Sequence, residues 1–107
     1  MKHYETLFII TPILSDQQIN KVINKFKNLI SNNSEIINEK TIGLKKLAYP
    51  IKKKTTGFYQ IFEFKSDLNI VKNLEIEYKK DERIIRFLTI FLDKYGIKYN
   101  EINLNKK

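Results

Sequence analysis

The sequence predicts an α+β domain in which four antiparallel strands form one sheet and two helices cover a single face of it. Four segments rich in β-branched or aromatic residues are interspersed with two segments whose apolar residues recur at helical spacing. Their order along the 107-residue chain is βαββαβ, without a linker between them, and this order defines the ferredoxin-like arrangement. We therefore predict one domain over residues 1–92 and a polar tail over residues 93–107.

The first strand and the first helix have clear boundary signals. A strand is expected over residues 4–11, because Pro12 cannot continue it. Ser15 with Gln18 three residues later is a capping-box signature for the start of a helix. The polar residues 32–34 should end this helix. Its expected apolar face consists of Ile19, Val22, Ile23, Phe26, Leu29 and Ile30.

The remaining elements follow the same logic. A second strand is expected from about residue 35 to residue 44, and a third over residues 58–64, directly after Gly57. Asp67 can cap a second helix, and the last strand is expected over residues 83–92. The core side of the second helix should carry Leu68, Val71, Leu74 and Tyr78.

Period-two alternation divides each strand between the two faces of the sheet. We assign the phenylalanine-rich sets to the core: Tyr4, Thr6, Phe8 and Ile10, then Phe58, Phe62 and Phe64, then Ile85, Phe87 and Phe91. The open face then carries Leu7, Ile9, Tyr59, Ile61, Leu88 and Ile90, together with Glu5, Glu63 and Arg86. Such a face is too apolar to be left to water. We predict that it docks a protein partner, with the alternative that residues 93–107 fold back over it.

The segment from Gly43 to Tyr59, GLKKLAYPIKKKTTGFY, places lysines on both sides of a short apolar centre. These lysines are Lys45, Lys46, Lys52, Lys53 and Lys54. Lysines mixed with an aromatic residue and bounded by glycines favour a loop that meets a phosphate backbone. We expect Tyr49 to be buried within this loop, because Pro50 fixes the backbone and apolar residues flank it. Stacking of Tyr49 on a ribose or base is the alternative.

Composition supports a polyanionic partner only modestly. The 20 basic and 12 acidic residues give a formal net charge of +8, which favours nucleic acid. However, only two of the basic residues are arginine, and the abundance of Lys, Asn and Ile is typical of A/T-rich coding. The absence of cysteine excludes disulfides and thiolate sites. No apolar run approaches the length of a membrane span, so we predict no membrane association.

No cluster of residues favours catalysis. His3 is the only histidine and has no second ligand for a metal, so we interpret it as an ordinary strand-edge residue. The carboxylate pairs Asp81-Glu82 and Glu75/Glu77 are expected at solvated helix ends. The glycines are isolated and form no phosphate-binding motif. We predict no catalytic residue, metal, cofactor or small-molecule substrate.

A stand-alone single-stranded RNA binder of the RNA-recognition-motif type is the alternative function. Such domains share this topology and stack bases on aromatic residues of the sheet. Gly57, Phe58 and Ile61 fit their third-strand motif, but Gln60 and Glu63 stand where aromatic residues should stack. Protein docking on the open face is therefore the better interpretation.

Three segments resemble, in order, the small-subunit ribosomal protein six family of bacteria and organelles. They are YETLFIITPILSDQQI from Tyr4, the Gly43–Tyr59 segment, and DERIIRFL from Asp81. The resemblance extends over residues 4–92. It implies a ferredoxin-like fold in the small subunit of a cytoplasmic or organellar ribosome. Members of the family pair there with ribosomal protein eighteen and, together with it, bind the central domain of the small-subunit ribosomal RNA.

Carried over by position, the resemblance implies that the lysine-rich segment lies beside RNA or the partner. Arg86 matches a basic position of the last strand, and Lys2 matches the basic N-terminus. The predicted RNA-binding set is Lys2, Lys45, Lys46, Tyr49, Lys52, Lys53, Lys54 and Arg86. Lys45 and Lys46 stand where the family commonly has arginine. Because lysine lacks the bidentate fork of arginine, its phosphate contacts should be less defined in geometry.

Overall fold

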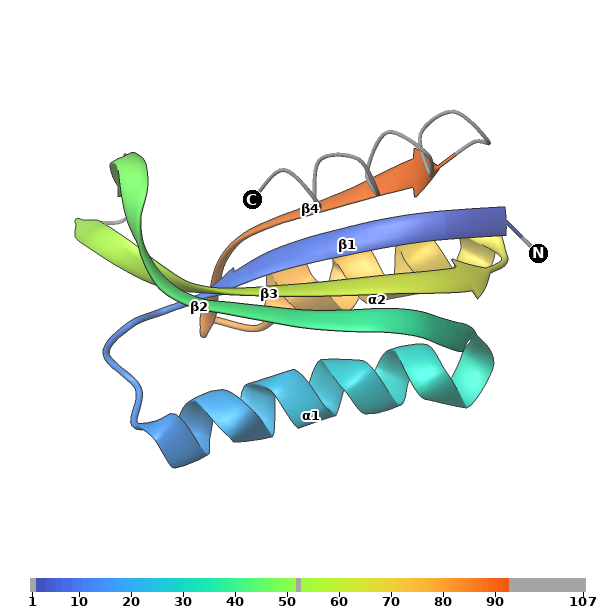
Figure 1. Cartoon of the computed structure of the whole chain (residues 1–107), viewed down its shortest axis with the longest axis horizontal. Helices are drawn as coiled ribbons and strands as arrows, with labels where there is room; N and C mark the ends of the chain where they lie inside the picture. The colour runs from blue at the N-terminus through green and yellow to red at the C-terminus, as the bar shows by residue number, and fades with distance from the viewer. Residues whose placement is uncertain (1, 52, 93–107) are drawn as a thin grey trace.

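The computed structural model describes residues 2–51 and 53–92, so the predicted tail lies outside the described residues. The elements follow the predicted order βαββαβ (Figure 1). They are β1 (Lys2–Ile10), α1 (Asp16–Asn33), β2 (Glu35–Ile51), β3 (Lys54–Ser66), α2 (Leu68–Lys80) and β4 (Ile84–Leu92). Neither of the described helices has the length and hydropathy needed to cross a membrane.

The strands form one antiparallel sheet in the order β2-β3-β1-β4, so β1 and β3 are central and β2 and β4 are edges. Phe8 of β1 shows that both helices cover the same face. Its ring centroid lies 5.3 Å from that of Phe26 in α1 and 5.3 Å from that of Tyr78 in α2. The two helical rings are themselves 4.7 Å apart. The predicted ferredoxin-like fold is confirmed.

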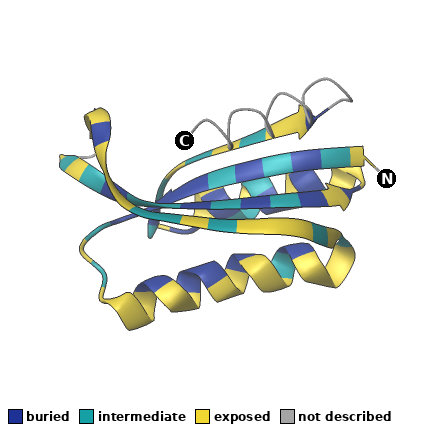
Figure 2. Ribbon diagram, in the orientation of Figure 1, coloured by how far each residue is buried: buried dark blue, intermediate teal, exposed yellow. Residues whose placement is uncertain are grey.

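The face beneath the helices is the core, and α1 turns its buried side toward it (Figure 2). Phe8, Phe26, Phe62, Phe64, Ile10, Val22 and Ile30 are among its fully buried side chains. Tyr78 is buried too, and its hydroxyl lies 3.0 Å from Oγ1 of Thr6, which is also 2.8 Å from Oγ1 of Thr89. Burial raises the pKa of Tyr78 far above its ordinary value, so this phenol stays neutral.

The two helices begin differently. The capping box of α1 is present as predicted: Ser15 Oγ accepts from the Gln18 N–H at 3.3 Å, and Gln18 Oε1 accepts from the Ser15 N–H at 2.9 Å. Asp67 precedes α2 as expected, but its side chain makes no capping hydrogen bond. The first helix is therefore started by a local signal, whereas the second depends on the burial of Val71, Leu74 and Tyr78.

β4 departs from simple alternation near its start. The register between β1 and β4 shifts between Ile9 and Ile10, so Ile84 lies opposite Ile10 and is buried in the core. A bulge of one residue reverses the faces of the residues beyond it. The prediction that Ile85 joins the core is therefore wrong. Phe91, in the same edge strand, keeps 56% of its surface exposed.

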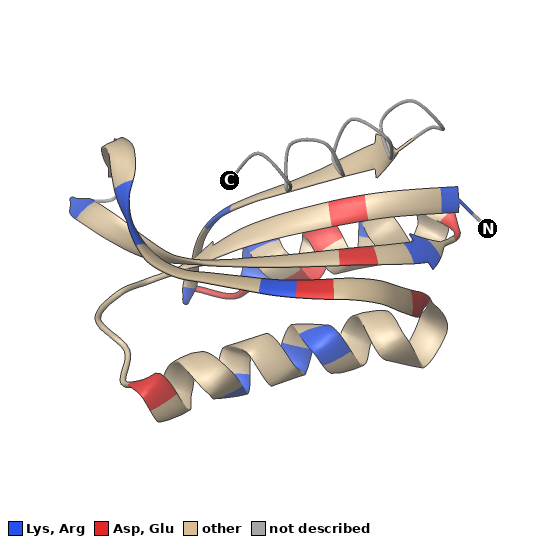
Figure 3. Cartoon of the chain, viewed as in Figure 1, with Lys and Arg blue, Asp and Glu red and all other residues tan. Residues whose placement is uncertain are grey.

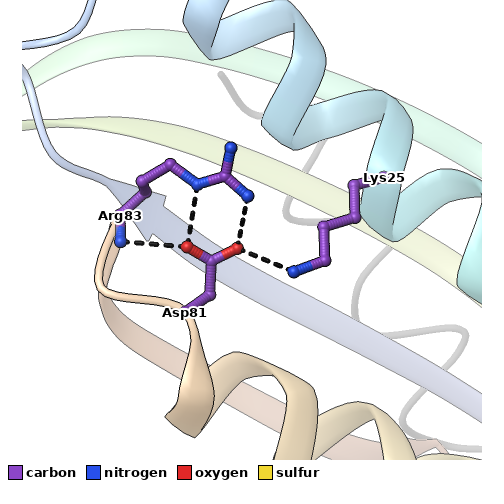
Figure 4. A network of polar contacts seen from close by, with 3 residues as sticks. All are labelled: Lys25, Asp81 and Arg83. Carbon is purple, nitrogen blue, oxygen red and sulfur yellow. Dashed lines mark hydrogen bonds and ion pairs between the residues drawn. The ribbon is translucent and has the colours of Figure 1, made fainter.

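The carboxylate of Asp81 organises the turn between α2 and β4 (Figure 4). Oδ1 accepts from the backbone N–H and the Nε of Arg83 at 3.0 and 2.9 Å, and Oδ2 accepts from Nη2 of Arg83 at 2.7 Å. Lys25 of α1 donates to Oδ2 at 3.0 Å. With 4% of its side chain exposed, Asp81 is not the solvated residue that we expected. The hydrogen bonds from Arg83 outweigh burial and hold the pKa of Asp81 far below its ordinary value.

Candidate nucleic-acid interface and open sheet face

The lysine-rich segment is a β-hairpin rather than the predicted loop. β2 continues to Ile51 and β3 begins at Lys54, and Lys45 and Lys46 lie opposite Gly57 and Thr56. We call its described residues, 45–51 and 53–57, the basic hairpin. It extends from one end of the sheet and curves away from the sheet plane (Figure 1).

Three backbone features shape the basic hairpin. Gly43 has a φ of 91° beside a shift in the β2–β3 register, and Lys53 has a φ of 65° at the tip. Only glycine adopts positive φ without cost, and the tight turn between the two strands requires it of the lysine at the tip. Pro50 is tolerated because β2 is an edge strand, with no neighbour on its outer side among the strands that the structure describes.

The hairpin carries its cations at the surface (Figure 3). Lys45, Lys46 and Lys53 are exposed, and Lys54 is half-buried. Lys52 lies outside the described residues. The structure therefore gathers four of the predicted RNA-binding lysines on one projecting ribbon.

Lys2 does not join this cluster. It begins β1 opposite Ser66, whereas the other end of β1, at Ile10, lies opposite Phe58 beside the hairpin. The nine residues of β1 separate these ends by about 26 Å at about 3.3 Å per residue. The ammonium of Lys2 lies 5.4 Å from the ring centroid of Phe91. A role of Lys2 in RNA binding would thus be independent of the hairpin.

An apolar contact anchors the basic hairpin on the sheet. Leu47 and Ile9 are 6% and 5% exposed. Both approach Gly57, where a Cβ would overlap Cγ2 of Ile9 and lie 3.6 Å from Cδ2 of Leu47. Glycine at this position permits that close approach. Ile9 belongs to the open face, as alternation predicts, but it is covered and offers a partner almost no surface.

Tyr49 lies at the surface with 60% of its area exposed, so the expectation that it is buried is wrong. Leu47 takes the buried place instead. The Tyr49 hydroxyl accepts a hydrogen bond from Nη1 of Arg86 at 3.0 Å, and the guanidinium carbon lies 6.0 Å from the ring centroid. Sequence reasoning missed this pair because 37 positions separate the two residues.

The remaining residues of the predicted partner face form one surface. Leu7 lies opposite Ile61 on one side and Leu88 on the other. Leu88 is 58% exposed and Ile90 is 38% exposed. A shallow depression of about 290 Å³ is lined by Leu7, Ile9, Tyr59, Arg86, Phe87 and Leu88. Exposed apolar surface of this kind suits a protein contact.

The open face changes character toward the start of β1. His3 Nε2 lies 2.8 Å from Oε2 of Glu63, and Glu5 lies directly opposite Glu63 (Figure 3). Burial and the neighbouring Glu63 raise the pKa of Glu5. His3 is therefore part of a cross-strand hydrogen bond in a central strand, which we did not expect. The open face has an apolar half near the hairpin and a charged half at the opposite end.

The sheet offers little for base stacking. Gln60 is fully buried on the core face, where its Oε1 accepts from the Thr41 hydroxyl at 2.6 Å. Glu63 is on the open face but is paired with His3. Among the described residues of β1 and β3, Tyr59 is the only phenylalanine or tyrosine on that face. An RNA-recognition motif stacks two or three bases on such residues.

A ferredoxin-like sheet with a projecting basic hairpin and an apolar open face defines a protein that binds macromolecules. The described residues contain no group of three or more His, Cys, Asp or Glu side chains placed to hold a metal ion. Comparison with known proteins identifies the family. The family model for Ribosomal protein S6 matches residues 3–90, and the chain belongs to the ribosomal protein S6 family, whose members are structural and non-enzymatic.

Relatives and a solved structure agree with this assignment. The chain is 52% identical over 108 residues to small ribosomal subunit protein bS6 of Phocaeicola vulgatus, covering all of this chain and 95% of the relative. It is 50% identical over 112 residues to the bS6 protein of Bacteroides thetaiotaomicron, covering 100% and 98%. The crystal structure of 30S ribosomal protein S6 from Thermotoga maritima superposes with a TM-score of 0.83 at 26% identity, covering 97% of both chains.

Proposed function

We propose that this chain is a structural constituent of the small ribosomal subunit that binds the central domain of the small-subunit ribosomal RNA jointly with ribosomal protein eighteen. The observation that carries the proposal is the basic hairpin lying beside an apolar open face in a chain of the ribosomal protein S6 family. The relatives named above are bacterial small-subunit proteins, which favours the cytoplasmic ribosome of a bacterium over an organellar one.

The hairpin lysines supply the RNA contact in this proposal. Each ammonium that neutralises a phosphate releases condensed counterions, which gives affinity that falls as salt rises. Lysine acts as a point charge, so these contacts add attraction without reading sequence. The specificity then has to come from the fold of the RNA and from the second protein.

The apolar half of the open face supplies the protein contact. Around the depression, Leu88 is exposed and Leu7 and Tyr59 are half-buried. Ile61 lies opposite Leu7, and Ile90 lies opposite Glu5, where the charged half begins. Covering them with a partner would remove apolar surface from water. Because hairpin and depression adjoin, an RNA and a partner protein that contact each other act as one linked ligand, for which the second contact forms at an effective concentration on the order of 1 mM.

The test is the affinity of the full chain for a central-domain RNA fragment, with and without ribosomal protein eighteen. Tight binding only in the presence of the partner is the expected result. Equally tight binding by the chain alone, including to generic single-stranded RNA, would contradict the proposal. It would favour the RNA-recognition-motif alternative and would make Tyr59 the residue to change next.

A salt titration tests the hairpin itself. Changing Lys52, Lys53 and Lys54 together to alanine should weaken RNA binding and reduce the slope of log affinity against log salt by up to about 3. The matched control changes three exposed lysines of the helices, Lys21, Lys72 and Lys79, to alanine. It removes the same number of charges from the helix-covered side of the protein. Equal slopes in the hairpin variant and the unmodified chain would remove the hairpin from the RNA interface.

A further inference from the structure

The contact between Arg86 and Tyr49 joins the two edges of the sheet. Tyr49 lies on β2 and Arg86 on β4, and the sheet order places both β3 and β1 between these strands. The hydrogen bond of 3.0 Å can form only because the hairpin end of β2 crosses over the open face. Arg86 thus reaches the basic hairpin from β4 through a polar contact, while Ile85 Cδ1 would lie 3.5 Å from a Cβ at Gly57.

This contact complements the apolar anchor beneath it. A small depression next to the larger one is lined by residues of both, among them Leu47, Tyr49 and Arg86. Leu47 and Gly57 pack against Ile9, and the Arg86–Tyr49 pair lies at the exposed side of the same contact. A two-stranded ribbon is marginally stable by itself, so these few contacts determine where the hairpin points.

We propose that Arg86 acts on the RNA interface through Tyr49, as a positioning residue that holds the basic hairpin over the sheet, and not as a phosphate ligand of its own. This inference rests on the proposed function for its RNA part. Nη1 donates to the phenol oxygen and the guanidinium carbon lies 6.0 Å from the ring centroid, so Tyr49 holds Arg86 through one hydrogen bond and a cation–π contact. The hairpin lysines then meet the phosphates from one fixed position.

The first experiment uses the full chain without RNA. Arg86→Met and Tyr49→Leu should each raise the rate of backbone amide hydrogen exchange in the basic hairpin by about fivefold. This is the effect expected when one of two side chains in contact loses its partner. Exchange in the centre of β1 should be unchanged. Lys72→Met, which removes one exposed charge from α2, is the matched control. Unchanged hairpin exchange in both variants would overturn the proposal.

The second experiment is a double-mutant cycle on RNA affinity. Each single variant is expected to bind RNA about fivefold less tightly than the unmodified chain. The double variant should bind RNA as tightly as the single variant of lower affinity. Independent RNA contacts by the two residues would instead multiply to about 25-fold and overturn the proposal. A direct phosphate contact would also reduce the salt slope by about 0.9 when Arg86→Met is added to Tyr49→Leu.

The two experiments separate this inference from the proposed function. If the triple lysine variant leaves RNA affinity unchanged, the proposed RNA interface fails and the RNA part of the inference fails with it. Faster hairpin exchange in the Arg86 and Tyr49 variants would still establish that the pair positions the hairpin. If the lysine variant loses affinity but the cycle is additive, the proposed function stands and the positioning role of Arg86 is wrong.

Discussion

The two faces of this sheet are made by the same strands but differ in how far the described residues cover them. On the helix-covered face, Phe8, Phe62 and Phe64 are fully buried and are closed in by two helices. On the open face, alternate residues of the same strands remain partly exposed, and within residues 2–51 and 53–92 the basic hairpin covers one corner of it. The helix-covered face therefore holds the fold together, whereas the open face keeps the exposed surface on which the proposed partner contact depends.

The difference shows what alternation does and does not decide. It places a residue on a face, but the cover of that face decides whether the residue stabilises the fold or meets a partner. Ile9 illustrates this, because it lies on the open face and yet is as buried as a core residue under Leu47. Phe91 is the reverse case, a residue predicted for the core that remains 56% exposed.

The largest effect is expected from truncating the helix-covered face. Phe26→Ala removes a fully buried ring that contacts both Phe8 and Tyr78, and should lower the free energy of unfolding by about 3–5 kcal/mol. Phe91→Ala, the exposed counterpart, should cost about 1 kcal/mol or less. Urea unfolding of both variants measures the difference. Equal losses of unfolding free energy in the two variants would contradict the conclusion that the helix-covered face stabilises the fold more than exposed positions do.

An intermediate effect is expected at the turn that joins the helix layer to the sheet. Asp81→Asn should lower the free energy of unfolding by about 2 kcal/mol at pH 7, because the buried carboxylate then no longer accepts ionic hydrogen bonds from Arg83 and Lys25. Affinity for the proposed partner should not change, since Asp81 bonds to Lys25 of the helix layer and does not itself line the depression. A loss of partner binding equal to that of Leu88→Ser would contradict this separation.

The cost of Asp81→Asn should depend on pH with a definite sign. The folded pKa of Asp81 lies below its ordinary value of 3.8, so the unfolded chain takes up this proton first as the pH falls. The stabilisation is complete above about pH 5 and is lost as the pH falls through the ordinary value toward the folded one. The free energies of unfolding of the variant and the unmodified chain should be closer to each other at pH 3 than at pH 7. The same difference at both pH values would contradict the ion-pair explanation.

The smallest global effect is expected where the hairpin meets the sheet. Gly57→Ala introduces a Cβ against Ile9 and should lower the free energy of unfolding by about 1–1.5 kcal/mol, since the hairpin can lift instead of straining the core. Gly43→Ala is the control: it strains a backbone φ of 91° but meets no atom within 4 Å. Hydrogen exchange at Leu47 should rise in the first variant only. Equal hydrogen exchange at Leu47 in the two variants would mean that the hairpin does not depend on the close approach of Gly57 to Ile9.

The parts that sequence reasoning predicted depend on local signals. The Ser15–Gln18 capping box spans four residues, and the alternation that places Phe8 and Phe62 needs only one strand at a time. The order of the elements follows from the same patterns. Because these signals are read within single segments, they indicate the fold without any knowledge of contacts.

The features of the structure that sequence reasoning missed depend on contacts between residues far apart in the chain. Lysines mixed with an aromatic residue and bounded by glycines predict a loop in this segment, but Lys46 pairs with Thr56 and the segment is a hairpin. The bulge near Ile9 changes which of Ile84 and Ile85 is buried, and no pattern within β4 shows that shift. The choice between Leu47 and Tyr49 as the buried residue likewise depends on the position of Gly57 in the facing strand.

The long outer strand β2 has a further consequence for how the chain behaves in solution. A free strand edge of 17 residues presents unpaired N–H and C=O groups, and such edges recruit strands from other copies into aggregates. In β2 that edge is interrupted by register shifts, lacks an N–H at Pro50 and carries the exposed charges of Lys45 and Lys46. We therefore expect the residues that make the hairpin basic also to disfavour self-association through this edge.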